Sequence, residues 1–247
     1  LDAVSFRVER GEFIGILGAN GSGKSTLARH LNALLVPESG TLWIDGIDTS
    51  DAEVSTRIKR RVGMIFQNPD NQIVATRVED DVAFGPENLG IAPDKIRLRV
   101  DNALSKVGLT DRAMEAPDRL SGGMKSKVAI AGVLAMKPMC MVFDESSAML
   151  DPGSRAEILK EVKKLNSEGI TIIWITHYAD ELTDADRILV MDDGRLVLEG
   201  SPREVYTHVE ELYEMGLEVP VVTRLGFELG IYGVLSVDEL GEALMNA

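Results

Sequence analysis

Residues 18–25 read G-A-N-G-S-G-K-S, and this stretch decides the fold of the chain. An apolar run at residues 13–17 precedes it and has the length of a buried strand. Residues 26–35 follow it and carry leucines at helical spacing. A strand, a glycine-rich loop and a helix in this order are the setting that a phosphate-binding loop needs.

The residue types of the loop explain how it would bind a polyphosphate. Glycines let the backbone adopt conformations that turn N–H groups inward, toward an anion at the positive end of the following helix. Lys24 would reach the β and γ phosphates, and the Ser25 hydroxyl would coordinate Mg²⁺. An accidental glycine-rich turn is the alternative, and the strand and helix on either side argue against it. The predicted nucleotide-binding residues are Gly18, Ala19, Asn20, Gly21, Ser22, Gly23, Lys24, Ser25 and Thr26.

The composition limits which partners the chain can have. Of its 247 residues 45% are hydrophobic, enough for one large domain with a small appendage. The 26 basic and 40 acidic residues give a net charge of -14, which disfavours binding to nucleic acid or to an anionic lipid surface. No uncharged apolar run has the length that crosses a bilayer. We therefore expect no nucleic-acid partner, no direct bilayer insertion, and membrane association through a protein partner.

The single cysteine, Cys140, lies in an apolar run at residues 139–143. It has no second cysteine for an internal disulfide, so we expect a buried structural thiol rather than a reactive one. Such cysteine usage fits a reducing compartment and predicts a soluble chain of the cytosol.

Apolar runs alternate with helical patterns along the chain, which predicts a parallel α/β sheet. The expected strands are residues 62–66, 140–143, 170–175 and 188–191, and residues 41–46 are expected to form a strand and a turn. The expected helices are one from Pro93 to Gly108, one after residues 120–123 that runs to Pro138, and one at residues 154–168.

The first residues alternate apolar and polar side chains. This pattern predicts a half-buried strand at residues 1–10, followed by a hairpin turn at residues 9–12. Leu1 is not an initiator, and only 17 residues precede the glycine loop. We therefore expect that an N-terminal strand has been removed.

Two other regions depart from simple alternation. Residues 67–90 contain prolines and several acidic residues, so we expect a loop with short helical pieces. In the tail, S-P-R-E at residues 201–204 and S-V-D-E at residues 236–239 fit the capping-box pattern. These patterns predict short helices that begin at Pro202 and Val237.

Asp144 and Glu145 follow the apolar strand that contains Cys140. Carboxylates at the end of a buried strand are common and can mean only a solvated strand end. Together with the glycine loop they indicate phosphate-transfer chemistry, in which Asp144 binds Mg²⁺ through water and Glu145 polarises the attacking water.

The motif L-S-G-G at residues 120–123 completes a larger pattern. The chain resembles the ATP-binding-cassette (ABC) ATPases in six motifs that stand in the family's order. They are the glycine loop, Gln67, the L-S-G-G signature, Asp144 with Glu145, the loop S-A-M-L-D at residues 147–151, and His177 after a strand.

The resemblance implies a fold and a shared site. The fold would be a P-loop NTPase with a mostly parallel sheet and an N-terminal antiparallel β subdomain. The ABC ATPase domain would occupy residues 1–205, with an inserted helical subdomain at about 86–125. A small helical extension at residues 206–247 would support dimerisation. ATP in the glycine loop of one chain would be covered by Ser121, Gly122 and Gly123 of a second ATPase chain.

Further site roles follow from the same resemblance. Asp151 would belong to the nucleotide site, and His177 would contact the γ phosphate. Gln67 would lie at the metal, sense nucleotide and relay closure to a membrane subunit. The implied catalytic set is Glu145, His177 and Gln67, and the implied metal set is Ser25, Gln67 and Asp144.

Finer features resemble the ATPases of energy-coupling-factor (ECF) importers, which include the cobalt and nickel importers. They are Q-N-P-D-N-Q-I-V at residues 67–74, V-E-D-D-V-A-F-G at residues 78–85, and G-L-E-V-P at residues 216–220. Residues 148–151 resemble the first of two paired ATPases. The resemblance implies a peripheral subunit on the cytoplasmic face of the membrane, bound to a transmembrane coupling subunit and a substrate-binding membrane component.

The chain also departs from the family pattern. Met124 replaces a usual glutamine, Ser126 and Lys127 replace frequent Gln and Arg, and Ser146 stands where Pro or Ala is usual. These changes bear on turnover and on contacts between the two ATPases. The family's adenine-stacking aromatic residue is absent from this chain.

The same motifs also occur in proteins with other functions. The ATPase of a conventional ABC transporter is the closest alternative, against which residues 68–72 and the tail argue. A cassette ATPase of DNA repair or translation would need a long insertion or a second cassette. A regulator without turnover fits poorly with Glu145 and His177. A vitamin and a transition-metal ion both stay open as cargo, as do a homodimer and a pair of related ATPases.

Overall fold

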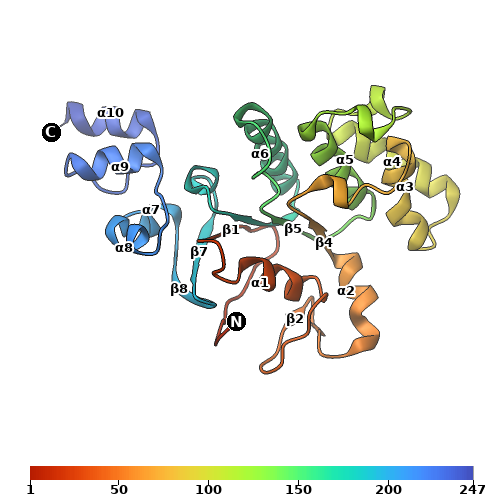
Figure 1. Cartoon of the computed structure of the whole chain (residues 1–247), viewed down its shortest axis with the longest axis horizontal. Helices are drawn as coiled ribbons and strands as arrows, with labels where there is room; N and C mark the ends of the chain where they lie inside the picture. Colours follow the sequence, from red (N-terminus) through yellow and green to blue (C-terminus); the bar gives the residue numbers. More distant parts are fainter. Residues whose placement is uncertain (247) are drawn as a thin grey trace. The chain divides into compact units, whose positions relative to one another are not determined.

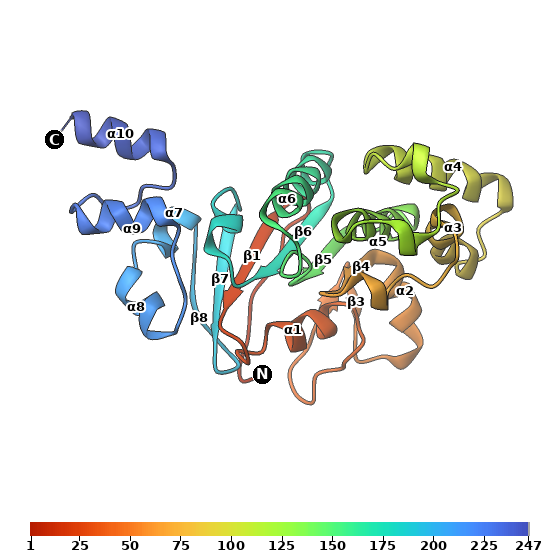
Figure 2. The same cartoon turned by 45° about the horizontal axis from the view of Figure 1, so that its top comes forward.

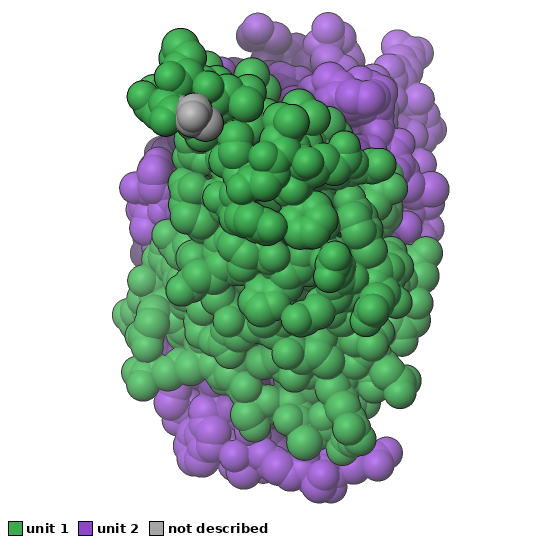
Figure 3. Space-filling view, turned by 90° about the vertical axis from the view of Figure 1, so that its left-hand side faces the viewer, with its two compact units in different colours: residues 1–27, 173–247 green, residues 28–172 purple. Residues whose placement is uncertain are grey.

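The structure, a computed structural model, describes residues 1–246 (Figures 1 and 2). Ala247, the last residue of the predicted C-terminal extension, lies outside the described residues. The chain forms two compact units, the first of Leu1–Leu27 with Ile173–Ala247 and the second of Ala28–Ile172 (Figure 3). They are called unit 1 and unit 2 below.

Unit 1 contains a sheet with the strand order β6-β1-β7-β8. Its strands are β1 (Phe13–Gly18), the end of β6 (Thr171–Thr176), β7 (Arg187–Asp192) and β8 (Arg195–Gly200). β1 pairs with β7 in parallel, with Ile16 opposite Leu189. All residues of β1 are buried, as expected for a strand with neighbours on both sides. The predicted strands at residues 13–17 and 188–191 are therefore confirmed.

The antiparallel strand β8 was not predicted. It forms a hairpin with β7, and Asp193 and Gly194 make the turn with positive φ angles of 42° and 76°. An Asp-Gly pair between apolar runs is a strong hairpin signal. The sequence therefore contained the evidence for this strand.

The helices of unit 1 cluster toward the C-terminus. They are η5 (Ala179–Leu182, a 3-10 helix), α7 (Pro202–Val205), α8 (Val209–Glu214), α9 (Val221–Glu228) and α10 (Val237–Met245). The predicted starts at Pro202 and Val237 are confirmed, whereas α8 and α9 were missed. α7 has a complete capping box. At α10 Ser236 caps the helix, but the Glu239 carboxylate accepts from the N–H of Leu235 instead.

Unit 2 contains the strand order β4-β5-β6 and a separate antiparallel pair. β4 (Val62–Ile65) and β5 (Cys140–Asp144) run parallel, and three residues of β5 are fully buried. The pair consists of β2 (Trp43–Ile44) and β3 (Ile47–Asp48). The predicted strand and turn at residues 41–46 agree with β2 and the turn at Asp45 and Gly46, whereas the return strand β3 was not predicted. The mostly parallel sheet with an antiparallel part agrees with the predicted fold class.

The helices of unit 2 are α2 (Ser55–Arg61), α3 (Val78–Asn88), α4 (Pro93–Lys106), α5 (Gly122–Ala135) and α6 (Pro152–Ser167), with the second half of α1 (Lys24–Leu31). Four 3-10 turns join them, η1 (Ala52–Val54), η2 (Pro69–Asn71), η3 (Thr110–Arg112) and η4 (Pro117–Arg119). α3, α4 and α5 pack against one another (Figures 1 and 2). The predicted helices that became α4, α5 and α6 are confirmed.

The prediction of a loop with short helical pieces at residues 67–90 agrees with residues 67–77, where the 3-10 helix η2 lies, and was wrong for residues 78–88, because α3 is a helix of 11 residues with Pro86 inside it. Its acidic residues Glu79, Asp80 and Asp81 lie in the first turn, where negative charge stabilises a helix. Val78 and Val82 are buried on one face. Burial of that face outweighs the lost backbone donor at Pro86.

Two predictions near the N-terminus were also wrong. Residues 1–10 form no strand: Val4, Phe6 and Val8 are less exposed than their neighbours, but no ladder pairs them within the described chain. The expected turn at residues 9–12 is present, closed by Glu12 N–H to Glu9. The helix expected at residues 26–35 ends at Leu31, because Ala33 takes a positive φ of 52°.

Cys140 begins β5 and is half-buried. Desolvation of its thiol raises the Cys140 pKa to about 12, so it stays a neutral thiol, as predicted for a structural cysteine. Across residues 1–246, the helices are too short or too polar to cross a lipid bilayer.

Candidate active site

The glycine loop leaves β1 inside unit 1 and can be built only with glycine at its key positions. A Cβ at Gly18 would lie 2.5 Å from the Ser22 Oγ and 2.6 Å from the backbone oxygen of Met191. Gly21 and Gly23 have φ angles of 86° and 101°, which L side chains rarely adopt. The loop is therefore held close to β7 and curls back on itself.

Lys24 closes this loop from the inside. It is the first residue of α1 and is only 3% exposed. Its ammonium donates to the backbone oxygens of Gly18 at 2.8 Å and Ala19 at 2.9 Å. A phosphate oxygen is a stronger acceptor for an ammonium than an amide carbonyl. Lys24 can therefore exchange these contacts for contacts with a phosphate at the same place.

The turn between β7 and β8 supports the glycine loop. The N–H of Gly194 donates to the Ser22 carbonyl at 3.0 Å. The Ser22 hydroxyl is buried and finds no hydrogen-bond partner among residues 1–246. A buried hydroxyl without a partner costs free energy, so an acceptor bound in the loop would relieve that cost. Ser25 and Thr26 follow as the second and third residues of α1.

His177 follows β6 directly, also in unit 1. Its imidazole packs on the Tyr178 ring with centroids 4.1 Å apart. The His177 Nδ1 is buried, and no described residue hydrogen-bonds to it. The Thr176 hydroxyl accepts from the N–H of Tyr178 at 3.0 Å, which fixes the turn. The ring is thus held by packing and keeps a nitrogen for another partner.

Asp144 and Glu145 end β5 in unit 2. Asp144 is buried. Glu145 is a non-glycine residue with a positive φ of 49°, a conformation that is concentrated at functional sites. The hydroxyls of Ser146 and Ser147 are buried without hydrogen-bond partners in the described part of the chain. The strand end is therefore polar, strained and suited to hold water.

The signature segment begins α5, also in unit 2. The Ser121 side chain caps the helix by accepting from the N–H of Met124 at 3.4 Å. Ser121 and Gly122 are exposed. A Cβ at Gly123 would lie 2.8 Å from the Ser154 Oγ, so α5 starts in close contact with the start of α6.

Asp151 belongs to this same contact. Its carboxylate caps α6 by accepting from the N–H of Ser154 at 3.0 Å. Hydrogen bonds from Ser154 lower the Asp151 pKa. The structure thus brings the predicted residues 121–123 and Asp151 together. Ser154, which joins them, was missed by sequence reasoning, although a small residue just after Asp-Pro-Gly was a usable signal.

Two of the residues that differ from the family pattern, Ser126 and Lys127, form contacts with nearby residues. The Ser126 hydroxyl donates to the Gly122 carbonyl at 3.2 Å, and Lys127 pairs with Glu157 at 2.6 Å. Neither contact obstructs the exposed end of α5.

Gln67 follows β4 and is exposed. The loop after it is fixed by side chains. Gln72 donates to the Met64 carbonyl at 3.2 Å and accepts from the N–H of Phe66 at 3.3 Å. Lys125 of α5 pairs with Asp70 of η2 at 2.7 Å. The polar run at residues 68–72 therefore shapes the loop that presents Gln67.

The chemistry of the predicted metal ligands fits magnesium. Ser25, Gln67 and Asp144 all offer oxygen atoms, which Mg²⁺ prefers. Across the described chain no group of three or more His, Cys, Asp or Glu side chains forms a metal site. A set with one carboxylate suits an ion that takes its other ligands from phosphate and water.

Comparison with known proteins adds independent evidence. Residues 1–148 match the model of the ABC transporter family. The energy-coupling factor transporter ATP-binding protein EcfA1 of Clostridium perfringens is 55% identical over 251 residues, which cover 99% of this chain and 89% of that protein.

Two solved structures are similar to the whole fold. One is cbiO1 of Clostridium perfringens, described as part of the ABC transporter complex cbiONQ, with a TM-score of 0.79 and 38% identity over 92% of this chain and 91% of that one. The other is the ATP-binding cassette MJ0796, solved as a dimer bound to ADP and Pi, with a TM-score of 0.72 and 31% identity over 81% of this chain and 89% of that one.

Proposed function

Because the chain belongs to the ABC transporter family, we propose that it is the ATP-hydrolysing subunit of an ECF-type importer. The near-complete coverage by an EcfA1 protein and the likeness to cbiO1 support this assignment. The cargo would be a vitamin or a transition-metal ion, selected by a membrane component. The subunit would bind peripherally at the cytoplasmic face.

The glycine loop would bind the ATP phosphates. Backbone N–H groups of residues 18–26 and the start of α1 would surround the β and γ phosphates. Lys24 would leave the carbonyls of Gly18 and Ala19 and donate to phosphate oxygens instead. Ser25, Gln67 and Asp144 would hold Mg²⁺, which when bound would neutralise phosphate charge.

The signature segment would act on the nucleotide of a second ATPase chain. The single observation that carries this proposal is the contrast in exposure between Lys24, which is 3% exposed, and the open residues Ser121 and Gly122. The free N–H groups at the start of α5 can bind an anion that arrives from outside the chain. A head-to-tail dimer would supply that anion as ATP.

Hydrolysis would then need a positioned water. Glu145 would orient it by accepting its proton. His177 would donate to the γ phosphate, and Gln67 would report the state of the site to the membrane subunit. Asp151 would stabilise the nucleotide side of the dimer.

A trapped dimer tests the shared site. The Glu145→Gln substitution should stop hydrolysis and leave the ATP contacts in place, so that bound ATP keeps two chains together by mass action. The Ser121→Arg substitution added to it should abolish that dimer in size-exclusion chromatography with Mg-ATP. Normal hydrolysis by the first variant, or an unchanged dimer in the second, would contradict the proposal.

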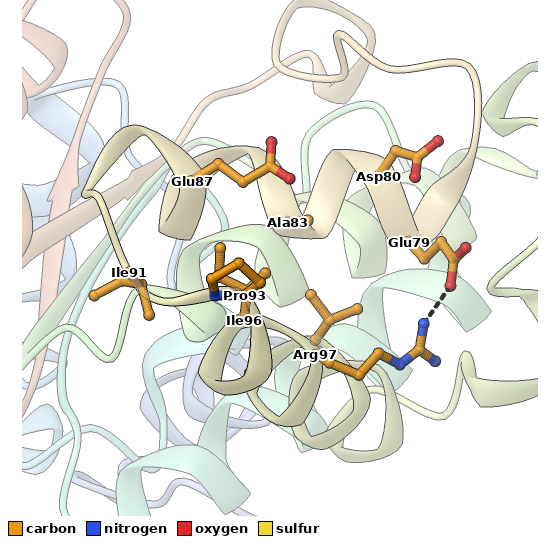
Figure 4. A pocket seen from close by; sticks show the side chains of 9 residues that line it. Glu79, Asp80, Ala83, Glu87, Ile91, Pro93, Ile96 and Arg97 are labelled. Carbon is orange, nitrogen blue, oxygen red and sulfur yellow. Dashed lines mark hydrogen bonds and ion pairs between the residues drawn. The ribbon is translucent and has the colours of Figure 1, made fainter.

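The membrane subunit would dock on the groove between α3 and α4. This groove encloses about 460 Å³ within unit 2 (Figure 4). Its lining combines apolar side chains such as Ala83 and Ile96 with three acidic ones and one basic one, which are Glu79, Asp80, Glu87 and Arg97. Glu79 and Asp80 already pair with arginines, whereas Glu87 forms no ion pair within residues 1–246. An amphipathic helix with a basic residue would fit such a groove.

Charge reversal in the groove tests the docking site. The Glu87→Lys variant should lose co-purification with the membrane subunits and keep basal ATP hydrolysis. The matched control is Glu210→Lys, which reverses an exposed charge on α8, far from this groove in sequence. Equal recovery of membrane subunits with both variants would assign docking to another surface.

A further inference from the structure

The segment that follows His177 is held more tightly than a surface turn requires. It forms the short helix η5, in which Ala179 and Leu182 are buried. The Trp174 indole donates to the Glu181 carboxylate at 2.8 Å inside the protein. A Cβ at Gly15 would lie 2.6 Å from the Leu182 side chain, so η5 sits directly on β1.

Tyr206 reaches this segment from the end of α7. It is fully buried, and its hydroxyl donates to the Ala179 carbonyl at 2.7 Å. Burial and the nearby Asp180 raise the Tyr206 pKa above its ordinary range, so the phenol keeps its proton and remains a donor. A wholly apolar site would be filled by phenylalanine without the cost of burying a hydroxyl.

Burial raises the carboxyl pKa of Asp180, the next residue of η5, and the neighbouring Glu218 and Glu181 add to the shift. The backbone of Val221, the first residue of α9, favours the charged form of this carboxyl. The extension therefore contacts η5 at Ala179, two positions after His177.

We propose that Tyr206 is a positioning residue for ATP hydrolysis. Its hydroxyl fixes the Ala179 carbonyl and thereby the turn that carries the His177 imidazole. This inference rests on the proposed contact between His177 and the γ phosphate. It also gives the C-terminal extension a direct physical route to the hydrolytic step.

The test is a double-mutant cycle on kcat. Tyr206→Phe removes one hydroxyl and should lower kcat about 3- to 10-fold, the loss expected for one misplaced hydrogen bond. The KM for ATP should stay unchanged, because the glycine loop is not altered. In a His177→Ala background, Tyr206→Phe should lower the residual kcat no further. Tyr213→Phe, which changes an exposed tyrosine of α8, is the control.

Calorimetric ATP binding shows whether a lower kcat comes from a misplaced His177 or from unfolded protein. If the Tyr206→Phe variant is folded, it should bind one ATP per chain. If His177→Ala leaves kcat intact, the proposed role of His177 is wrong. If His177→Ala lowers kcat but Tyr206→Phe leaves it unchanged, or lowers it equally in both backgrounds, the positioning role is wrong. If Tyr206→Phe lowers kcat and the number of ATP molecules bound per chain by the same factor, the variant is partly unfolded, and the positioning role is wrong as well.

Discussion

Glycines occur at the start of two helices, in the glycine loop before α1 and in the signature segment at the start of α5. The two segments differ in whether a basic side chain is buried beside them. The glycine loop before α1 is closed around its own cation, since Lys24 is 3% exposed. The signature segment before α5 has no lysine or arginine at residues 120–123, and Ser121 and Gly122 face solvent. The same helix-start chemistry is thus buried at the first site and open to solvent at the second, as expected if the second acts on the nucleotide of another chain.

The glycines are required for different reasons at the two sites. A side chain at Gly18 would strike the backbone oxygen of Met191, which cannot move without β7. A side chain at Gly123 would strike the side chain of Ser154, and one at Gly122 would meet only Leu150 at 3.7 Å. In the glycine loop, a side chain at Gly18 is therefore excluded by the backbone. In the signature segment, a side chain at Gly123 is excluded only by the Ser154 side chain.

The largest effect is expected at the closed site. Lys24→Ala should weaken Mg-ATP binding by about 100-fold or more, because two charge-assisted hydrogen bonds to phosphate each contribute roughly 1.5–3 kcal/mol. Isothermal titration calorimetry measures the change. Lys160→Ala, at an exposed site on α6, is the control for loss of positive charge. Equal affinity in the two variants would show that the loop does not depend on its cation.

The second largest effect is expected when a side chain is added at Gly18. Gly18→Ala should destabilise the fold by about 2–3 kcal/mol, since overpacking against a fixed backbone is costly. Urea unfolding measures it, with Gly122→Ala as the matched change at the open site. That control should be neutral or slightly stabilising, because alanine favours helices. A similar loss at both positions would remove the distinction between the sites.

A smaller effect is expected at Gly123. Gly123→Ala should cost about 1 kcal/mol, because the Ser154 side chain can shift. Adding Ser154→Gly should restore most of the unfolding midpoint. No recovery would mean that another contact makes this glycine necessary.

The smallest effect concerns pH at the open site. Hydrogen bonds from Ser154 hold the Asp151 pKa below its ordinary value of 3.8 in the folded state. The stabilisation is therefore complete above that value and is lost as the pH falls through the lower folded-state pKa. Asp151→Asn keeps a capping acceptor without a titrating group. Its urea midpoint should thus fall less between about pH 5 and pH 3, and an equal fall would contradict the cap.

The local structure around the candidate site could be predicted from the sequence. The glycine loop and the carboxylates after β5 stand in unbroken stretches, where glycine conformation and strand burial are readable locally. The Asp193-Gly194 pair also indicates a hairpin from the sequence, although the hairpin was not predicted.

Contacts between distant residues could not be predicted in the same way. Tyr206 binds a carbonyl 27 residues away, and Ser154 lies under a glycine of another helix. α3 was missed because the rule that proline breaks helices ignores a buried apolar face. In each case the deciding energy comes from packing between segments that are far apart in the sequence.

The backbone conformation of Glu145 lowers the stability of the folded chain. A side-chain-bearing residue at a φ of 49° costs about 1 kcal/mol, which glycine would largely recover. A Glu145→Gly protein should therefore be sturdier than its parent and unable to turn over ATP. The catalytic role proposed for the Glu145 carboxylate would therefore be obtained at a cost in folding stability.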